Sequence, residues 1–166
     1  IRIAFEAIAK RCRCGKCKVC VLHFDGVGNV GPTPLKRRVP PRVLNALAPP
    51  RTGVGSSNLG PSLAEAARIV AANPTVDQFN LVIFSDFELL DPNLDQILHD
   101  LNSFPGEVHL VCLGEQLPPS IAGLLDERIT VTTLTPANAP GAVARALLRS
   151  MTEDRPGARV ADEPEA

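Results

Sequence analysis

Residues 81–91 read Leu-Val-Ile-Phe-Ser-Asp-Phe-Glu-Leu-Leu-Asp, an apolar run that stops at a serine and an aspartate. A continuous apolar run such as residues 81–84 is typical of a strand buried on both faces in a parallel sheet. We therefore expect it to form an interior strand. Ser85 and Asp86 follow where that strand ends. In open α/β sheets, ligands bind beyond the carboxyl ends of the strands, which makes Asp86 a candidate site residue.

The preceding stretch, residues 53–63, reads Gly-Val-Gly-Ser-Ser-Asn-Leu-Gly-Pro-Ser-Leu and is a polar loop that enters a helix. Pro61 suits the first helical turn, where its missing N–H costs nothing, and apolar residues then recur at helical spacing. The Asn73-Pro74 pair ends this helix. Ser57 at the helix entrance and Asp86 at the strand exit are expected on one rim, with side-chain oxygens on the order of 4 to 8 Å apart.

Helical and strand patterns alternate along the whole chain. We expect helices over residues 1–11, 41–47, 61–72, 92–101, 118–125 and 139–151, strands over 19–24, 81–84, 107–113 and 128–134, and a short edge strand near 35–39. Alternation of this kind predicts an α/β fold, a three-layer, Rossmann-like, mainly parallel sheet with helices on both faces. The helices at 61–72 and 93–101 are natural covers for the strand at 81–84 through right-handed crossovers.

The length of the chain suits a single hydrophobic core. With 166 residues, it is long enough for one core and short for two. Residues 152–166 are charged, contain proline and glycine, and have little to bury, which predicts a disordered tail. We assign residues 1–151 to one domain and residues 152–166 to that tail.

The loop and the strand together resemble the von Willebrand factor A-type domain. That family has a loop written Gly-Gly-Thr-Asn-Leu-Gly-x-x-Leu and, about thirty residues later, a buried strand that ends Thr-Asp-Gly. Here residues 55–63 read Gly-Ser-Ser-Asn-Leu-Gly-Pro-Ser-Leu and residues 85–87 read Ser-Asp-Phe. Order and spacing agree, whereas Ser56, Ser57 and Phe87 stand where the family has Gly, Thr and Gly.

The resemblance implies that the first strand of the family fold is missing. The family's Asp-x-Ser-x-Ser motif follows that strand, and Asp25-Gly-Val-Gly-Asn does not replace it, because Val27 cannot ligate a metal. Residues 1–11 then correspond to the family's first helix and residues 19–25 to its second strand. We expect the flanking strands to expose unpaired edges, an aggregation liability, unless a longer parent protein supplies the strand. A fragment or a misassigned start is the other explanation.

The resemblance also implies a partial metal-ion-dependent adhesion site. In the family, the residue corresponding to Ser57 ligates the metal, the residue corresponding to Asp86 acts through water, and a partner's acidic side chain fills the open position. Hydroxyl and carboxylate oxygens suit Mg²⁺, although two of them cannot complete an octahedral site. The structural alternative is that Ser57, Asn58 and Ser62 only cap a helix. The implied function is a non-enzymatic protein-interaction module with a degenerate site, bound to another protein.

A cysteine cluster gives the alternative function. Cys12, Cys14, Cys17 and Cys20 could hold Zn²⁺ or an iron–sulfur cluster, or act as a redox dithiol. Structural zinc usually takes two separated cysteine pairs, however, and Cys20 falls within a predicted strand. The competing interpretation is a loop of accessible thiols without a fixed metal, with Cys20 as a small core residue.

Several other functions find little support in the sequence. The glycine-rich loop has no lysine from 53 to 66 and lacks the dinucleotide spacing, which disfavours nucleotide binding. His23, His99 and His109 have no catalytic partner at a recognisable spacing, and Lys36-Arg37-Arg38 reads as a solvated loop. A net charge of -1 argues against nucleic acid. No signal peptide or membrane segment is recognised in this chain, which favours a cytoplasmic location.

Overall fold

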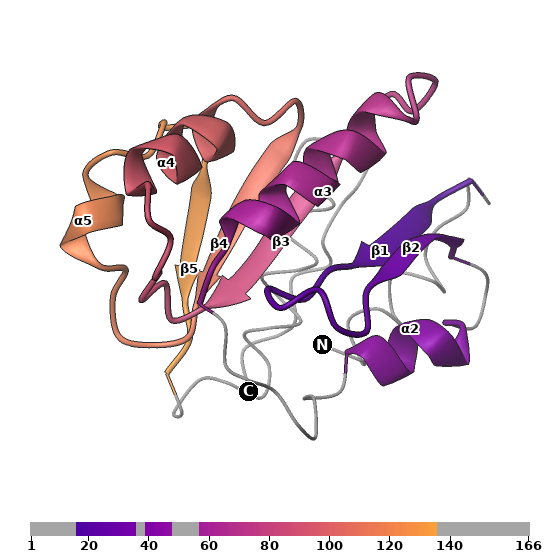
Figure 1. Ribbon diagram of the computed structural model, residues 1–166, viewed down its shortest axis with the longest axis horizontal. Coiled ribbons are helices and arrows are strands. Elements are labelled where there is room, and N and C mark those ends of the chain that lie inside the picture. The colour runs from indigo at the N-terminus through magenta and orange to yellow at the C-terminus, as the bar shows by residue number, and fades with distance from the viewer. Residues whose placement is uncertain (1–15, 36–38, 48–56, 136–166) are drawn as a thin grey trace, which may run out of the picture.

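The computed structural model describes residues 16–35, 39–47 and 57–135, which form helices and two sheets (Figure 1). An antiparallel hairpin pairs β1 (Lys18–Val21) with β2 (Val30–Pro34). A three-stranded parallel sheet has the order β3-β4-β5, formed by β3 (Asn80–Ser85), β4 (Glu107–Cys112) and β5 (Thr130–Thr133). The α/β fold class predicted from the sequence is confirmed at this level.

The described helices lie close to where the apolar spacing predicts them. They are α2 (Pro41–Ala46), α3 (Gly60–Ala71), α4 (Leu94–Asn102) and α5 (Pro119–Ala122). The side chain of Asn93 caps α4 by accepting a hydrogen bond from the Gln96 N–H at 3.1 Å. Beyond the end of α3, the Asn73 amide donates to the Ile69 carbonyl at 2.8 Å, and Pro74 prevents continuation. None of the helices in the described ranges is both long and apolar enough to cross a bilayer.

One face of the parallel sheet carries the main core. Buried residues of α3, α4, α5, the strands and the adjoining loops meet there, namely Leu59, Leu63, Ile83, Phe87, Ile97, Leu98, Leu101, Val108, Leu110, Cys112, Leu117 and Ile121. The sheet grows in one direction from β3 to β5, so right-handed crossovers place α4 and α5 on the same side. The helices expected at 61–72 and 93–101 do cover β3, but α3 and α4 share one cluster with Ile83 and therefore pack on the same face of the strand.

The other face of the sheet carries a smaller apolar cluster. Val111 and Leu134 are buried in it, with Val82 and Phe84 packed against them. No helix of the described ranges contributes to this cluster. The helices expected at 1–11 and 139–151, and the tail at 152–166, lie outside the described residues, so helices on both faces remain a prediction.

The placement of β3 differs from the expected interior position. Within the described part of the chain, β4 is the central strand and β3 pairs with β4 alone. The hairpin forms its own sheet and does not extend the β3 ladder. The apolar run at residues 81–84 correctly predicted a strand. An apolar run indicates that side chains need to be buried, but it does not indicate which strands pair with it.

The hairpin packs with α2 around a second cluster of Val19, Leu35, Val39 and Val43. The edge strand expected near residues 35–39 lies earlier, at Val30–Pro34. Its two prolines are compatible with this position, because an edge strand has one side that needs no N–H donors. The Ser62 hydroxyl of α3 donates to the His23 carbonyl at 3.0 Å, and Phe24 packs against the main core. These contacts anchor the hairpin beside α3.

Candidate functional site

The candidate site is the carboxyl rim, which we define as residues 57–60, 85–91 and 112–116. These segments are the loop that enters α3 and the loops that follow the carboxyl ends of β3 and β4. Leu113 N–H donates to the Ser85 carbonyl at 2.8 Å, which holds the second and third segments together. The rim is the position at which α/β sheets of this kind bind ligands.

A carboxylate from the loop after β3 closes the amino end of α3. Asp91 accepts hydrogen bonds from the backbone N–H of Leu59 at 2.7 Å and from that of Gly60 at 2.8 Å, one with each carboxylate oxygen. The Leu90 N–H donates to the Ser57 carbonyl at 3.2 Å. The first N–H groups of a helix have no partner within the helix and carry partial positive charge, so a carboxylate there is stabilising.

This contact corrects the capping expected from the sequence. The N-cap residue of α3 is Leu59, and no local side chain caps it. Ser62 is buried in the first turn and donates to the hairpin instead. Asp91, which follows Leu59 by 32 residues and Gly60 by 31, caps the helix instead of Ser57, Asn58 or Ser62. It also occupies amides that a phosphate would need, in agreement with the poor match to nucleotide-binding loops.

Beyond β3 the chain makes a tight polar turn. The Phe87 N–H donates to the Ser85 hydroxyl at 2.9 Å, and the Glu88 N–H donates to Asp86 Oδ1 at 3.2 Å. Phe87 has a φ of 60°, in the left-handed region that disfavours side chains, yet its ring is 1% exposed within the main core. Glycine would adopt this backbone without strain, and the resembled family has glycine at this position. In this chain, burial of the large Phe87 ring offsets the strain.

Asp86 lies close to the end of β4. Burial raises the pKa of the Cys112 thiol, and the negative charge of Asp86 raises it further. The Cys112 thiol donates to the Gln116 carbonyl at 3.3 Å. Asp86 itself is exposed, whereas Cys112 is buried, so the carboxylate is the accessible group of the two.

The rim brings together the segments that carry Ser57 and Asp86. Ser57 is half-buried and lies beside Leu90, in the loop that begins with Asp86. The distance between the two side-chain oxygens stays a prediction. Among the residues that the structure describes, no three His, Cys, Asp or Glu side chains converge as a metal site would require. Ser57 and Asp86 could give Mg²⁺ a hydroxyl and a carboxylate oxygen, with water for the remaining positions.

The cysteines of the alternative site are only partly described. Cys12 and Cys14 lie outside the described residues. Cys17 packs against the hairpin cluster, and Cys20 lies further along the same strand region. Burial raises the pKa of the Cys20 thiol, the carboxylate of Glu65 raises it further, and Lys18 acts in the opposite direction. Cys20 is therefore a poor thiolate at neutral pH, and thiolate is the form that binds metal.

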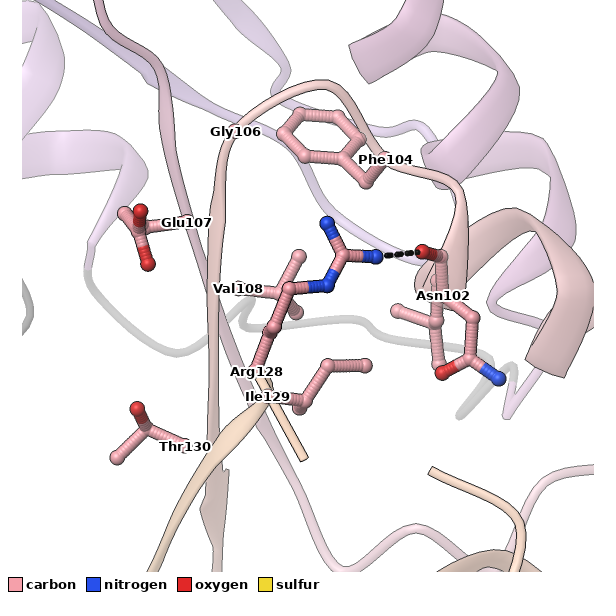
Figure 2. Close-up of a pocket in the computed structure, with 9 residues that line it drawn as sticks. Asn102, Phe104, Gly106, Glu107, Val108, Arg128, Ile129 and Thr130 are labelled. Atoms are coloured by element: carbon pink, nitrogen blue, oxygen red, sulfur yellow. Dashed lines mark hydrogen bonds between the residues drawn. The ribbon is translucent and has the colours of Figure 1, made fainter. Parts of the chain in front are cut away.

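A pocket of about 360 Å³ lies at the other end of the sheet (Figure 2). It is lined by the first residues of β4 and β5, Glu107 and Thr130, and by the Arg128 guanidinium. That guanidinium donates to the Asn102 carbonyl at 2.9 Å and pairs with Asp126 at 3.0 Å. The pocket is thus separate from the rim. His109, for which the sequence indicates no catalytic partner, is buried in β4 with Nε2 2.9 Å from the Thr132 hydroxyl.

The strained turn predicts an unusual order of stability for substitutions at Phe87. Phe87→Ala and Phe87→Gly both lose the buried ring, at a cost of about 3–5 kcal/mol. Glycine tolerates the left-handed backbone, so Phe87→Gly should be more stable than Phe87→Ala by about 1 kcal/mol. Ile83→Ala and Ile83→Gly, in regular strand backbone, should show the reverse order. Urea unfolding measures both pairs, and the same order at both positions would contradict a left-handed Phe87.

The raised pKa of Cys20 predicts slow alkylation. The folded chain holds the thiol proton more tightly than the unfolded chain, so the rate of reaction with iodoacetamide should rise at a higher pH when the protein is folded. Mass spectrometry of the modified peptides gives this profile, with the urea-unfolded chain as control.

Elemental analysis should find no stoichiometric zinc. About one Zn²⁺ per chain, lost in a Cys14→Ser, Cys17→Ser variant, would favour the cysteine alternative.

Comparisons of this chain with protein-family models, with curated proteins and with solved structures return no match.

Proposed function

We propose that this chain is a non-enzymatic protein-interaction module that resembles the von Willebrand factor A-type domain and contacts its partner through the carboxyl rim. The observation that carries the proposal is the link between two distant loops. Asp91 holds the amino end of α3, and Leu90 holds Ser57, so the loop resembling the family's threonine loop lies beside the loop that follows β3. That juxtaposition is what a contact site at the rim requires.

Exposed side chains support the rim as a contact surface. Leu90 is 73% exposed and Leu113 is 52% exposed, and they lie in the loops that follow β3 and β4. Asp86 and Glu88, which precede Leu90 on the same loop, are also exposed. Apolar side chains with polar neighbours are typical of surfaces that bind proteins.

The charges of the rim limit how an acidic partner could bind. Its charged residues, Asp86, Glu88, Asp91 and Glu115, are all acidic. A partner carboxylate would be repelled unless a cation lay between the two, and the phosphates of a nucleic acid would be repelled likewise. In the proposed degenerate site, Ser57 and Asp86 would hold Mg²⁺, which would supply the open position for the partner's acidic side chain.

A cation held by so few protein oxygens should bind weakly. We expect calorimetry to show no tight Mg²⁺ site. An NMR titration should show small, unsaturated shifts at the Ser57 and Asp86 amides that are lost in a Ser57→Ala, Asp86→Asn variant, with Asp77→Asn as a control on an exposed loop. Acetate should shift the same amides only when Mg²⁺ is present.

Two results would contradict this proposal in different ways. A tight, stoichiometric Mg²⁺ site abolished by Asp86→Ala would replace the degenerate site with a complete one. Shifts of equal size in the wild type and in the double variant would remove Ser57 and Asp86 from the site altogether.

A further inference from the structure

The pocket at the amino end of the sheet opens where the two ladders of β4 begin at different residues. β4 pairs with β3 from Glu107 onward, whereas its pairing with β5 begins later, at His109. Residues 106–108 and 128–130 lie on the two sides of this opening. A volume of about 360 Å³ is at the lower end of the range for small-molecule sites, so the pocket suits one side chain and the amide groups next to it.

The floor of the pocket is apolar and belongs to the main core. It is formed by Leu101, Phe104, Val108 and Ile129. The turn after Phe104 approaches β3 so closely that a Cβ at Gly106 would collide with the Phe79 carbonyl oxygen, and only glycine fits there. The shape of the floor is therefore set by the fold before any ligand binds, which lowers the entropic cost of binding.

The Arg128 guanidinium has N–H groups that the described fold does not use. Nε and Nη2 donate to the Asp126 carboxylate at 3.0 and 3.4 Å, and Nη2 also donates to the Asn102 carbonyl at 2.9 Å. These bonds fix the guanidinium beside Phe104 and Val108 (Figure 2). A guanidinium also carries the N–H groups of Nη1. Among the residues that the structure describes, no acceptor bonds to Nη1, so a ligand carbonyl could accept from it.

The charges around the pocket favour a positive group at its mouth. The hydrogen bond to Asp126 and the charge of Asp126 raise the pKa of Arg128, and the charge of Glu107 raises it further. Because Arg128 is paired with Asp126, it adds no surplus positive charge, whereas Glu107 and Glu127 are acidic and exposed. Neighbouring residues of a strand point to opposite faces, so Glu107 lies at the mouth and not on the Val108 floor (Figure 2). A carboxylate would be repelled there, and a lysine or arginine would be attracted.

An exposed leucine at the margin of the pocket indicates a protein ligand. Leu124 is 56% exposed, and its carbonyl accepts a hydrogen bond from the Asn102 amide at 3.0 Å, which places it next to a pocket-lining residue. Pro105, in the turn before Gly106, is exposed as well. Exposed apolar residues around a pocket with a fixed floor are typical of protein contacts in which one buried side chain acts as the anchor.

We propose that this pocket binds an apolar side chain of a second protein, with leucine as the type of anchor. The side chain lies on the apolar floor, and the backbone carbonyl of the same residue accepts a hydrogen bond from Nη1 of Arg128. Lysine or arginine next to the anchor faces Glu107 and Glu127. The site lies at the other end of the sheet from the carboxyl rim and requires no metal, so it does not depend on the function proposed for the rim.

A short peptide tests the anchor and its flanks. The probe is acetyl-Lys-Leu-Lys-amide, and NMR in EDTA follows the Arg128 Nε–H and the Val108 and Ile129 amides of the full chain. Replacing the leucine of the peptide by glycine should weaken binding at least about tenfold, because the leucine side chain is buried in the complex. Replacing both lysines by glutamate should weaken it about fivefold, and added salt should reduce that difference.

A variant of Arg128 tests the hydrogen bond from Nη1. Arg128→Lys keeps the positive charge and removes the Nη1 donors, so it should weaken binding of the probe about fivefold. Arg68→Lys makes the same change in an exposed arginine of α3 that also pairs with a carboxylate, that of Glu65, and should leave binding unchanged. Circular dichroism checks that each variant is folded. If Arg128→Lys is unfolded, Glu107→Gln at its exposed position should weaken binding of the probe and leave that of acetyl-Gly-Leu-Gly-amide unchanged.

Several results would overturn this proposal. Equal binding of the leucine and glycine peptides would exclude an apolar anchor. Tighter binding of the glutamate peptide would make the pocket an anion site. Shifts at the Ser57 and Asp86 amides, with none at Val108 and Ile129, would move the contact to the rim. Because EDTA removes Mg²⁺, failure here is distinguishable from failure of the metal-dependent contact at the rim.

Discussion

The pair of hydrogen bonds between the Asp91 carboxylate and the first amides of α3 fixes the geometry of the carboxyl rim. A hydrogen bond to a charged group contributes about 1.5–3 kcal/mol, more than a neutral one, and here it joins elements that are distant in sequence. The turn at Ser85, Asp86 and Phe87 precedes Asp91 on the same loop, and Ser57 lies on the other side of the contact. The Leu90 N–H and the Ser57 carbonyl join the same two loops, and the carboxylate adds the charged part of this contact.

The carboxyl rim is acidic because basic residues are absent from this part of the sequence. Between Arg68 and Arg128 the sequence has no lysine or arginine, and it holds ten aspartate or glutamate residues. Residues 1–51, in contrast, contain eleven of the 17 basic residues. Of the ten acidic residues, Asp86, Glu88, Asp91 and Glu115 belong to the carboxyl rim, which has no basic residue to balance them. The proposed contact at the rim depends on this charge, because a partner's carboxylate would need a cation there.

Local pattern predicted the elements of the fold well. The apolar spacing at Leu63, Ala66 and Val70 indicated α3, and the runs at residues 81–84 and 107–113 indicated β3 and β4, because those signals arise from neighbouring residues. It also placed Ser57 and Asp86 in loops that the structure brings to one rim. Order within the sheet was not predictable in the same way, and β3 proved to be the edge of its sheet as described. The sequence did not predict that Asp91 caps α3, because a cap from so distant a residue leaves no short-range signal. The sequence showed only that an acidic residue follows the strand at 81–84.

The account depends most directly on the strength of the Asp91 contact, which the free energy of unfolding measures. Asp91→Asn keeps the shape of the side chain and removes its charge, and Asp77→Asn provides the same change on an exposed loop. Urea unfolding should show Asp91→Asn to be less stable than the wild type by about 1.5–3 kcal/mol, with Asp77→Asn nearly unchanged. A loss at Asp91 within about 0.5 kcal/mol of that at Asp77 would show that the rim is held by something else.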